Sequence, residues 1–337
     1  MSKKSSINNI VKLSIPIFFA NLAVPLVAIV DTGLMGNLDN ASYLTATSIA
    51  SSVFSLIFWS FGFLRMGTVG IVAQAHGSKQ YDEIVNLLFR NITFVILISL
   101  LLILCQKYIF IISLNIFELS DDTTKYFKEY FDLRIYSSFG ELIIYIIAGL
   151  FIGLQKTKIS SLAVGFFSIT NIIFSLLFVV YFDLNVQGVA LGTVISSTLT
   201  AIIFLSYTFF ELQKLTSIKI NLSKIFNLKK IHKLFNINFD IFIRSALLTF
   251  SFLFFTYLGN TISEDIVAAN TILLNLIMLS AFILDAYAFS TEGIVGYSIG
   301  SKDKKLLTDV IINSFILSAS TGLLISLIYL VGKNNFI

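Results

Sequence analysis

Long apolar runs dominate this sequence and restrict the folds that it can adopt. Nine runs are long enough, at 1.5 Å per helical residue, to cross about 30 Å of hydrocarbon. They are residues 13–36, 47–76, 84–106, 131–154, 159–181, 188–210, 239–259, 266–299 and 306–331. They lack the alternation of barrel strands, and in lipid every backbone polar group needs an internal partner. The sequence therefore predicts an all-α polytopic membrane protein with nine transmembrane helices. The composition agrees, with 56% hydrophobic and 12% charged residues.

The sequence also repeats itself. After a shift of 223 residues, residues 68–79 match residues 291–302 at seven of twelve positions without a gap. Residues 36–37 match residues 259–260 in the same register. Internal repeats in a hydrophobic chain are typical of transporters built from two related lobes. A first unit of 223 residues leaves 114 of the 337 for the second, so about three helices of a second six-helix lobe are expected to be absent.

Lysine and arginine are distributed unevenly along the loops. If the N-terminus is cytoplasmic, sixteen of the 23 lie on the inner side and four on the outer side. Because cytoplasmic loops are enriched in these residues, we predict a multi-pass protein of the plasma (inner) membrane with its N-terminus in the cytoplasm. The first apolar run itself serves as the targeting signal. We attribute the net charge of +4 to topology and to contact with anionic lipid, and we expect no nucleic-acid partner.

The predicted chain has three parts. Residues 1–211 form an N-lobe of transmembrane helices 1–6, residues 212–238 form a cytoplasmic linker, and residues 239–337 form a partial, three-helix C-lobe of helices 7–9. The linker carries six lysines among apolar residues. It is expected either to lie on the inner membrane surface as an amphipathic helix or to be a solvated connection between the lobes.

Ionisable residues inside the apolar runs are the strongest functional signals, since a charge at the bilayer centre costs on the order of 2.5–3.5 kcal/mol. Seven residues fit this description: Asp31, Arg65, Arg134, Glu141, Arg244, Asp285 and Glu292.

Asp31 is notable because its run contains Pro16 and Pro25, the only two prolines in the chain. Pro25 cannot donate a hydrogen bond to the carbonyl of Asn21, so the helix is expected to bend below Asp31. An apolar cavity disfavours the anion, which would let Asp31 exchange a proton near neutral pH. The alternative is an ordinary acid at the outer end of the helix.

Several motifs carry a family resemblance. They are residues 15–17 (IPI), 24–26 (VPL), 30–36 (VDTGLMG), 63–77, 185–193, 240–248 and 284–292. Together they resemble the multidrug and toxic compound extrusion (MATE) family, specifically its DinF-like branch. The resemblance implies twelve helices in two lobes of six around a central cleft. It also implies export of organic cations and other amphipathic compounds by antiport with protons or sodium. In that family alternating access is coupled to bending of the first helix, whose acid corresponds to Asp31.

The resemblance also suggests an ion site, from which this sequence departs. In better-known members the fifth helix pairs an Asn with an acid four residues later; here Asn171 is present but Ser175 replaces the acid. Proton coupling through Asp31 is therefore favoured over a two-carboxylate sodium site, unless Glu141 substitutes for the missing acid. We expect no cofactor other than the coupling ion, and no other metal.

Asp285 and Glu292 lie seven residues apart, which places both on one face of a helix. With Arg65, Arg244 and Gln74 they are predicted to line a substrate cleft. The alternative is that the acids pair with Arg65 or Arg244 and fix the packing of the helices.

The leading functional prediction is a secondary active exporter of amphipathic or cationic small molecules, in which protonation of Asp31 bends the first helix. Its expected partners are a small organic substrate and the lipid bilayer. A flippase for lipid-linked oligosaccharides of the same architecture, and a non-functional truncated remnant, remain alternatives. An enzyme is not expected, because the sequence has no His-Glu-x-x-His or Gly-x-Ser-x-Gly pattern.

Overall fold

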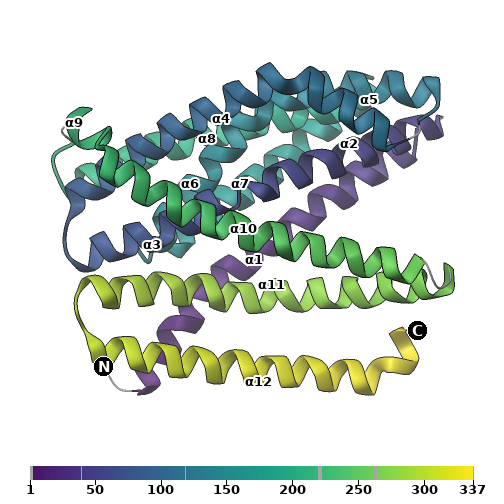
Figure 1. Cartoon of the computed structure of the whole chain (residues 1–337). Coiled ribbons are helices and arrows are strands. Elements are labelled where there is room, and N and C mark those ends of the chain that lie inside the picture. Colours follow the sequence, from purple (N-terminus) through teal and green to yellow (C-terminus); the bar gives the residue numbers. More distant parts are fainter. Residues whose placement is uncertain (1–2, 39, 118, 219–221, 261–263, 337) are drawn as a thin grey trace.

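Helices make up nearly all of the computed structural model, which describes residues 3–38, 40–117, 119–218, 222–260 and 264–336 (Figure 1). No strand occurs in these ranges. A 3-10 turn, Ile135–Ser137, joins α5 to α6, and a π-helical turn, Leu177–Tyr181, extends α7. The α-helices are α1 (Lys3–Gly36), α2 (Ala41–Ser60), α3 (Phe63–Gly77), α4 (Tyr81–Ile116), α5 (Asp121–Arg134), α6 (Ser138–Gly153), α7 (Thr157–Leu176), α8 (Asn185–Gln213), α9 (Leu222–Ile225), α10 (Leu228–Asn260), α11 (Glu264–Gly300) and α12 (Lys304–Phe336).

Eight candidate membrane spans are present in the described residues, by length and composition. They are Ile7–Gly36, Ala41–Gly77, Tyr81–Ile116, Asp121–Gly153, Thr157–Tyr181, Asn185–Gln213, Ile272–Gly300 and Lys304–Gly332. The remaining predicted run, residues 239–259, falls in α10, some of whose side chains lie outside the described residues. The all-helical fold is confirmed, and the number of spans agrees approximately with the prediction.

The sequence did not predict two interruptions, one within a membrane span and one within the linker. Residues 47–76 read as one continuous apolar run, but the structure ends α2 at Ser60 and begins α3 at Phe63. The predicted amphipathic linker helix is likewise divided: α9 is four residues long, and α10 begins at Leu228, within the predicted linker. Residues 219–221 of that linker lie outside the described residues.

Helix α1 crosses the bundle diagonally (Figure 1). Its N-terminal half packs against α11 and α12, where the Ser14 and Ser290 hydroxyls lie 2.7 Å apart. Its C-terminal half packs against α7 and α2. The helix continues without a break across Pro16 and Pro25, so the bend remains a prediction. One helix thus contacts both α2 and α7 in the first part of the chain and α11 and α12 at its end.

The main hydrophobic core is formed by α2–α8 and includes Phe54, Phe127, Phe131 and Phe151, each almost fully buried. Burial differs strongly along the chain. In the most apolar part of Asp121–Gly153, 78% of the residues are buried, whereas none is buried in the corresponding part of Lys304–Gly332. In the structure, α12 therefore exposes an apolar surface, while α6 forms the centre of the core.

Helices α3 and α11, which contain the repeated segments, pack closely together. Gly77 and Gly300 are equivalent in the repeat, as are Gln74 and Tyr297. A Cβ added to Gly77 would lie 2.1 Å from the carbonyl oxygen of Tyr297, and one added to Gly300 would lie 2.0 Å from that of Gln74. Only glycine permits so close an approach of two helix backbones. Because the contact is reciprocal, as at a two-fold axis, the sequence repeat is also a local symmetry of the structure.

Candidate functional site

Asp31 lies in α1 where this helix packs on α7. Its carboxylate lies against the Ser175 hydroxyl of α7. Asn171 precedes Ser175 by one turn, so the two residues lie on the same side of α7. Asp31 Oδ1, Asn171 Oδ1 and Ser175 Oγ are all buried, and none of them has a hydrogen-bond partner among the described residues. We call Asp31, Asn171, Ser175 and Thr193 the Asp31 cluster.

Helix α8 orients Asn171. The amide Nδ2 of Asn171 donates a hydrogen bond of 2.9 Å to Thr193 Oγ1, which itself donates to the carbonyl of Val189 at 3.0 Å. These bonds fix the amide group, so its oxygen is turned away from α8 with its acceptor capacity unused. The cluster therefore presents one carboxylate and several neutral oxygens in a buried position.

Glu141, which was predicted as a possible substitute for the missing acid, is engaged elsewhere. Its Oε1 forms an ion pair with Arg134 Nη1 and accepts a hydrogen bond of 2.9 Å from Ser137 Oγ. The Arg134 and Glu141 side chains are only 11% and 13% exposed. Among the described residues no hydrogen bond joins Glu141 to Asp31, and Glu141 does not act electrostatically on Asp31, so Glu141 does not serve as a second carboxylate of the Asp31 cluster.

Arg134, one of the seven ionisable residues found in the apolar runs, is a neighbour of Asp31 to which the sequence assigned no role. Its positive charge acts on Asp31, and its guanidinium carbon lies 5.2 Å from the ring centroids of Phe54 and Phe58. The spacing of Arg134 and Glu141 could have indicated their ion pair. Residues seven apart lie two turns from each other on the same face of a helix. With Glu141 neutralising it, Arg134 does not serve as a dedicated counter-ion for Asp31.

The other predicted site residues gather between α3, α10 and α11. Arg65 and Arg244 both exert an electrostatic attraction on Asp285 and on Glu292. Their charged groups nevertheless form no direct ion pair in the described part of the chain. Asp285 and Arg244 are exposed, whereas Arg65 and Glu292 are half-buried. We call these four residues the α11 charge cluster.

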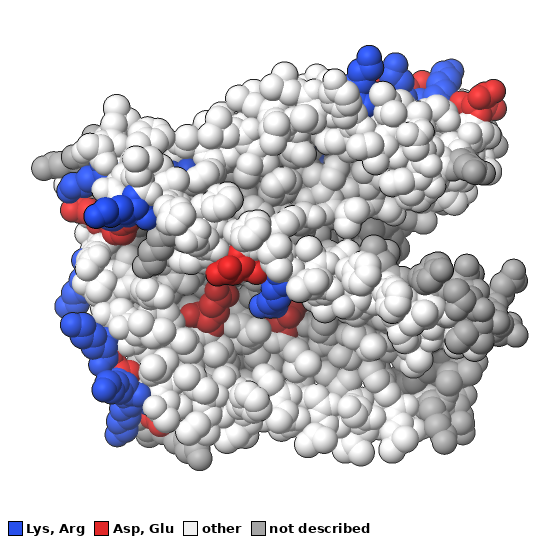
Figure 2. Space-filling model, viewed as in Figure 1, with Lys and Arg blue, Asp and Glu red and all other residues white. Residues whose placement is uncertain are grey.

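An aromatic ring borders this cluster. The guanidinium carbon of Arg65 lies 3.9 Å from the ring centroid of Phe289, a cation–π contact. Figure 2 shows acidic and basic side chains in a hollow near the middle of the molecule, apart from the charged groups at its ends. A site of this kind can attract an organic cation through its carboxylates.

Gln74 is not brought to the α11 charge cluster by a contact. It lies nine residues after Arg65, about 13.5 Å along α3, at the backbone contact with Gly300. Its side chain is exposed. In the described residues there is no group of three or more His, Cys, Asp or Glu residues that could hold a metal ion.

Comparison with known proteins identifies the family. The MatE family model matches residues 16–177 and 241–337, which together make up most of the chain. The chain belongs to the MatE family. It is 30% identical over 325 residues to DNA damage-inducible protein F of Escherichia coli K12, covering 96% of this chain and 71% of that protein. The resemblance to the DinF-like branch is therefore confirmed.

More distant MatE relatives are also similar. Multidrug export protein MepA of Staphylococcus aureus is 24% identical over 238 residues, which cover 71% of this chain and 52% of that protein. The chain thus spans about half the length of this relative. A Vibrio cholerae MATE transporter, VcmN, in its bent form is 19% identical with a TM-score of 0.85, over 98% of this chain and 74% of that one. A Pyrococcus furiosus transporter of the MOP superfamily gives 18% identity and a TM-score of 0.84. These likenesses show the MATE fold.

Membership of the MatE family makes this chain a multi-pass membrane transporter rather than an enzyme. The Asp31 cluster lies in candidate membrane spans, as do Arg65, Asp285 and Glu292 of the α11 charge cluster, whereas Arg244 lies in α10. The chemistry of the two clusters, rather than the fold, must therefore indicate which ion and which kind of substrate are transported.

Proposed function

We propose that this MATE chain exports amphipathic or cationic small molecules in exchange for protons, and that Asp31 carries the coupled proton. The observation that carries the proposal is the buried carboxylate of Asp31, whose Oδ1 lies without a hydrogen-bond partner beside equally unpartnered oxygens of α7. A lone buried carboxylate is stabilised by binding a cation or a proton. The relatives named multidrug export proteins support the direction of transport and the kind of substrate.

The chemistry of the Asp31 cluster favours a proton over sodium. A proton needs a single carboxylate oxygen, whereas a dehydrated sodium ion needs several oxygen ligands and gains from additional negative charge. Ser175 contributes a neutral hydroxyl, and Glu141 is already paired with Arg134. The cluster thus offers one uncompensated negative charge, which one proton neutralises.

Helix α1 is suited to transmit the proton-binding event. Neutralising Asp31 weakens its attraction to Arg134 and changes the contact between α1 and α7, while the other half of α1 packs on α11 and α12. Pro25 lies between these two regions and lacks the backbone hydrogen bond that would stiffen the helix. A bend at Pro25 would move the part of α1 that packs near the α11 charge cluster. We assign this cluster to substrate binding.

The proton gradient supplies the driving force. In the proposed orientation the N-terminus is cytoplasmic, because sixteen of 23 Lys and Arg residues then lie on the inner side. Each proton that enters the cell releases roughly 2.3 kcal/mol per 100 mV of membrane potential, in addition to the pH term. In a one-for-one exchange with a monovalent cation the electrical terms of the proton and the substrate cancel, so the pH gradient drives that export; for a neutral substrate both terms contribute.

The test is transport by the 337-residue chain in proteoliposomes with an imposed pH gradient. We expect a permanently charged organic cation to accumulate on the acidic side, because antiport moves it against the proton flux. Asp31→Asn should abolish this accumulation while the protein still folds. The matched control is Asp183→Asn, which removes an exposed acid near the end of the same helix pair and should leave transport intact. Equal transport by wild type and Asp31→Asn would rule out the assignment of Asp31.

A second variant distinguishes the two ions. Ser175→Asp restores the carboxylate that better-known MATE members carry one turn after the Asn. We expect wild-type transport to be indifferent to a sodium gradient at constant pH, and Ser175→Asp to respond to one. Sodium-driven transport by the wild type would contradict proton coupling.

A further inference from the structure

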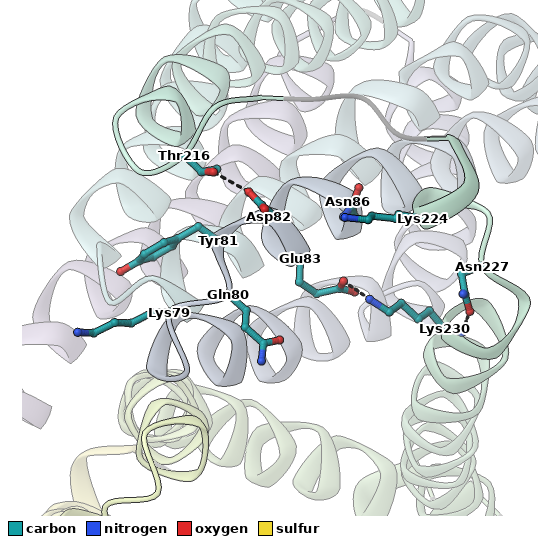
Figure 3. Close-up of a pocket in the computed structure, with 10 residues that line it drawn as sticks. All are labelled: Lys79, Gln80, Tyr81, Asp82, Glu83, Asn86, Thr216, Lys224, Asn227 and Lys230. Atoms are coloured by element: carbon teal, nitrogen blue, oxygen red, sulfur yellow. Dashed lines mark hydrogen bonds and ion pairs between the residues drawn. The ribbon is translucent and has the colours of Figure 1, made fainter.

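The linker between the predicted lobes borders a polar pocket that the proposed transport cycle does not use. A cavity of about 460 Å³ lies between the start of α4 and the segment that contains α9 and the start of α10. Figure 3 shows Asn86 on α4 facing the linker side chains Lys224, Asn227 and Lys230. Lys224 belongs to α9, Asn227 to the turn that follows it and Lys230 to the first turn of α10, and all three line the pocket.

The linker is held in place beside this pocket. The buried side chain of Arg90 donates hydrogen bonds to the carbonyl oxygens of Ile225, at 2.9 Å, and Lys224, at 3.1 Å. These carbonyls end the short helix α9, where a guanidinium is a favourable partner. Lys230 forms an ion pair with Glu83 of α4, and this pair closes the other side of the pocket. The pocket wall is therefore a built structure rather than a loose surface.

Positive charge predominates in this pocket. Three lysines and two acids border it, and Arg90 adds a further positive charge 3.7 Å from Glu83. Both acids are already engaged, since Asp82 accepts a hydrogen bond of 2.6 Å from Thr216 and Glu83 is paired with Lys230. Lys79 also borders the pocket, but its ammonium group points away from the other side chains in Figure 3. After the Glu83–Lys230 pair is set aside, Lys224 and Arg90 outweigh the single charge of Asp82. This excess of positive charge favours an anion as the occupant.

A buried amide provides a second, independent indication of a ligand. The Asn86 side chain is 95% buried, with a relative exposure of 5%, and it lines the pocket. No hydrogen bond joins it to another described residue. A buried amide without a partner costs free energy that a ligand oxygen in the pocket would recover.

Exposed apolar side chains next to the pocket indicate the source of the anion. Leu222, Phe226 and Leu228 are 65%, 50% and 81% exposed and alternate with the pocket residues Lys224, Asn227 and Lys230. The pocket also lies at the end of the molecule where the span Tyr81–Ile116 begins. Apolar residues that flank basic ones are typical of a segment lying at the membrane interface.

We propose that this pocket binds the phosphoryl head group of an anionic phospholipid, with Lys224, Asn86 and Lys230 as the phosphate-binding residues. Leu222, Phe226 and Leu228 then lie against the acyl chains. Basic pockets at the cytoplasmic side of membrane helices recognise such head groups by charge and hydrogen bonding. The bound lipid would join the N-terminal end of α4 to the linker. This site is independent of Asp31 and of the proposed proton coupling.

The experiment measures saturable binding of single lipids to the purified 337-residue chain by native mass spectrometry and by thermal stabilisation in detergent. Phosphatidylglycerol is the anionic probe and phosphatidylcholine the neutral one. Lys224→Gln should raise the Kd for phosphatidylglycerol about fivefold, because this is the change in Kd that corresponds to the binding free energy of one lysine near an anionic membrane surface. Lys229→Gln removes the same charge from an exposed neighbour that does not line the pocket and should leave the Kd unchanged.

Asn86→Leu provides the second variant, because it removes the buried amide without changing charge. It should also weaken phosphatidylglycerol binding, while the lipid-free melting temperature reports whether the fold is kept. If glycerol 3-phosphate alone binds and shows the same dependence on Lys224 and Asn86, the phosphoryl site stands but its ligand is soluble. Equal binding of the two lipids, or equal effects of Lys224→Gln and Lys229→Gln, would overturn the proposal.

Discussion

The Asp31 cluster and the α11 charge cluster balance charge in different ways. In the first, one buried carboxylate faces neutral oxygens, and the nearby Arg134 is already paired with Glu141. In the second, two carboxylates and two guanidinium groups attract one another without a direct ion pair. The first arrangement gains from a proton, while the second is neutral before any ligand binds. Similar residue types therefore suit an ion-coupling role in one place and a substrate-contact or packing role in the other.

The largest effect is expected at the boundary of the Asp31 cluster. Glu141→Gln leaves the buried Arg134 without its partner, so we expect the free energy of unfolding to fall by about 3–5 kcal/mol. Thermal unfolding in detergent measures this loss. Replacing both members of the pair, Arg134→Met with Glu141→Leu, should recover most of it, because no buried charge is then uncompensated.

A matched control for that variant is Asp132→Asn, which removes an exposed acid of α5 and should change stability by less than about 0.5 kcal/mol. If Glu141→Gln is as stable as Asp132→Asn, the ion pair is not what holds α5 and α6 together. Glu141 would then again be available as a second coupling acid.

A smaller effect, on transport rather than on folding, is expected in the α11 charge cluster. Asp285→Asn should reduce export of a cationic dye by about tenfold, equivalent to about 1.4 kcal/mol. Because Asp285 is exposed and makes no direct ion pair, its loss should change stability by less than about 1 kcal/mol. Dye export and thermal unfolding of the same variant separate the two roles. A loss of folding as large as that of Glu141→Gln would assign Asp285 to packing.

At the two neutral α7 residues of the Asp31 cluster we expect effects on stability of up to about 2 kcal/mol. Asn171→Leu removes the buried bond to Thr193 and should cost about 1–2 kcal/mol of stability, since it leaves a hydroxyl without its donor. Ser175→Ala removes an oxygen that has no partner among the described residues and should cost less than about 1 kcal/mol. Thermal unfolding of the two variants side by side checks this order. The reverse order would mean that Ser175, rather than Asn171, is held by the structure.

The sequence predicted the fold better than it predicted the sites. Apolar runs locate helices directly, because a spanning helix must be long and hydrophobic, and the repeat of residues 68–79 at 291–302 marked two equivalent helices. The break between α2 and α3 was missed, since Phe61 and Gly62 do not interrupt the apolar run.

The sites depend on contacts between distant segments, which hydropathy does not encode. Arg134 and Glu141 were both recognised as ionisable residues in the membrane, yet the choice of partner is decided by how α5 and α6 meet. Arg90 is one of the sixteen Lys and Arg residues that the sequence analysis counted on the inner side. In the structure it is buried within α4 and binds two carbonyl groups of the linker, a role that its position in the sequence did not reveal.

The reciprocal contact of Gly77 and Gly300 carries a consequence for how such a chain can change. If the two halves were separate copies of one chain, a single glycine codon would encode the glycine of both contacts. One mutation would then place a side chain at both contacts at once. In the fused chain each glycine is altered separately, so either half can acquire its own version of the contact. Asymmetry between the two halves can therefore accumulate one contact at a time.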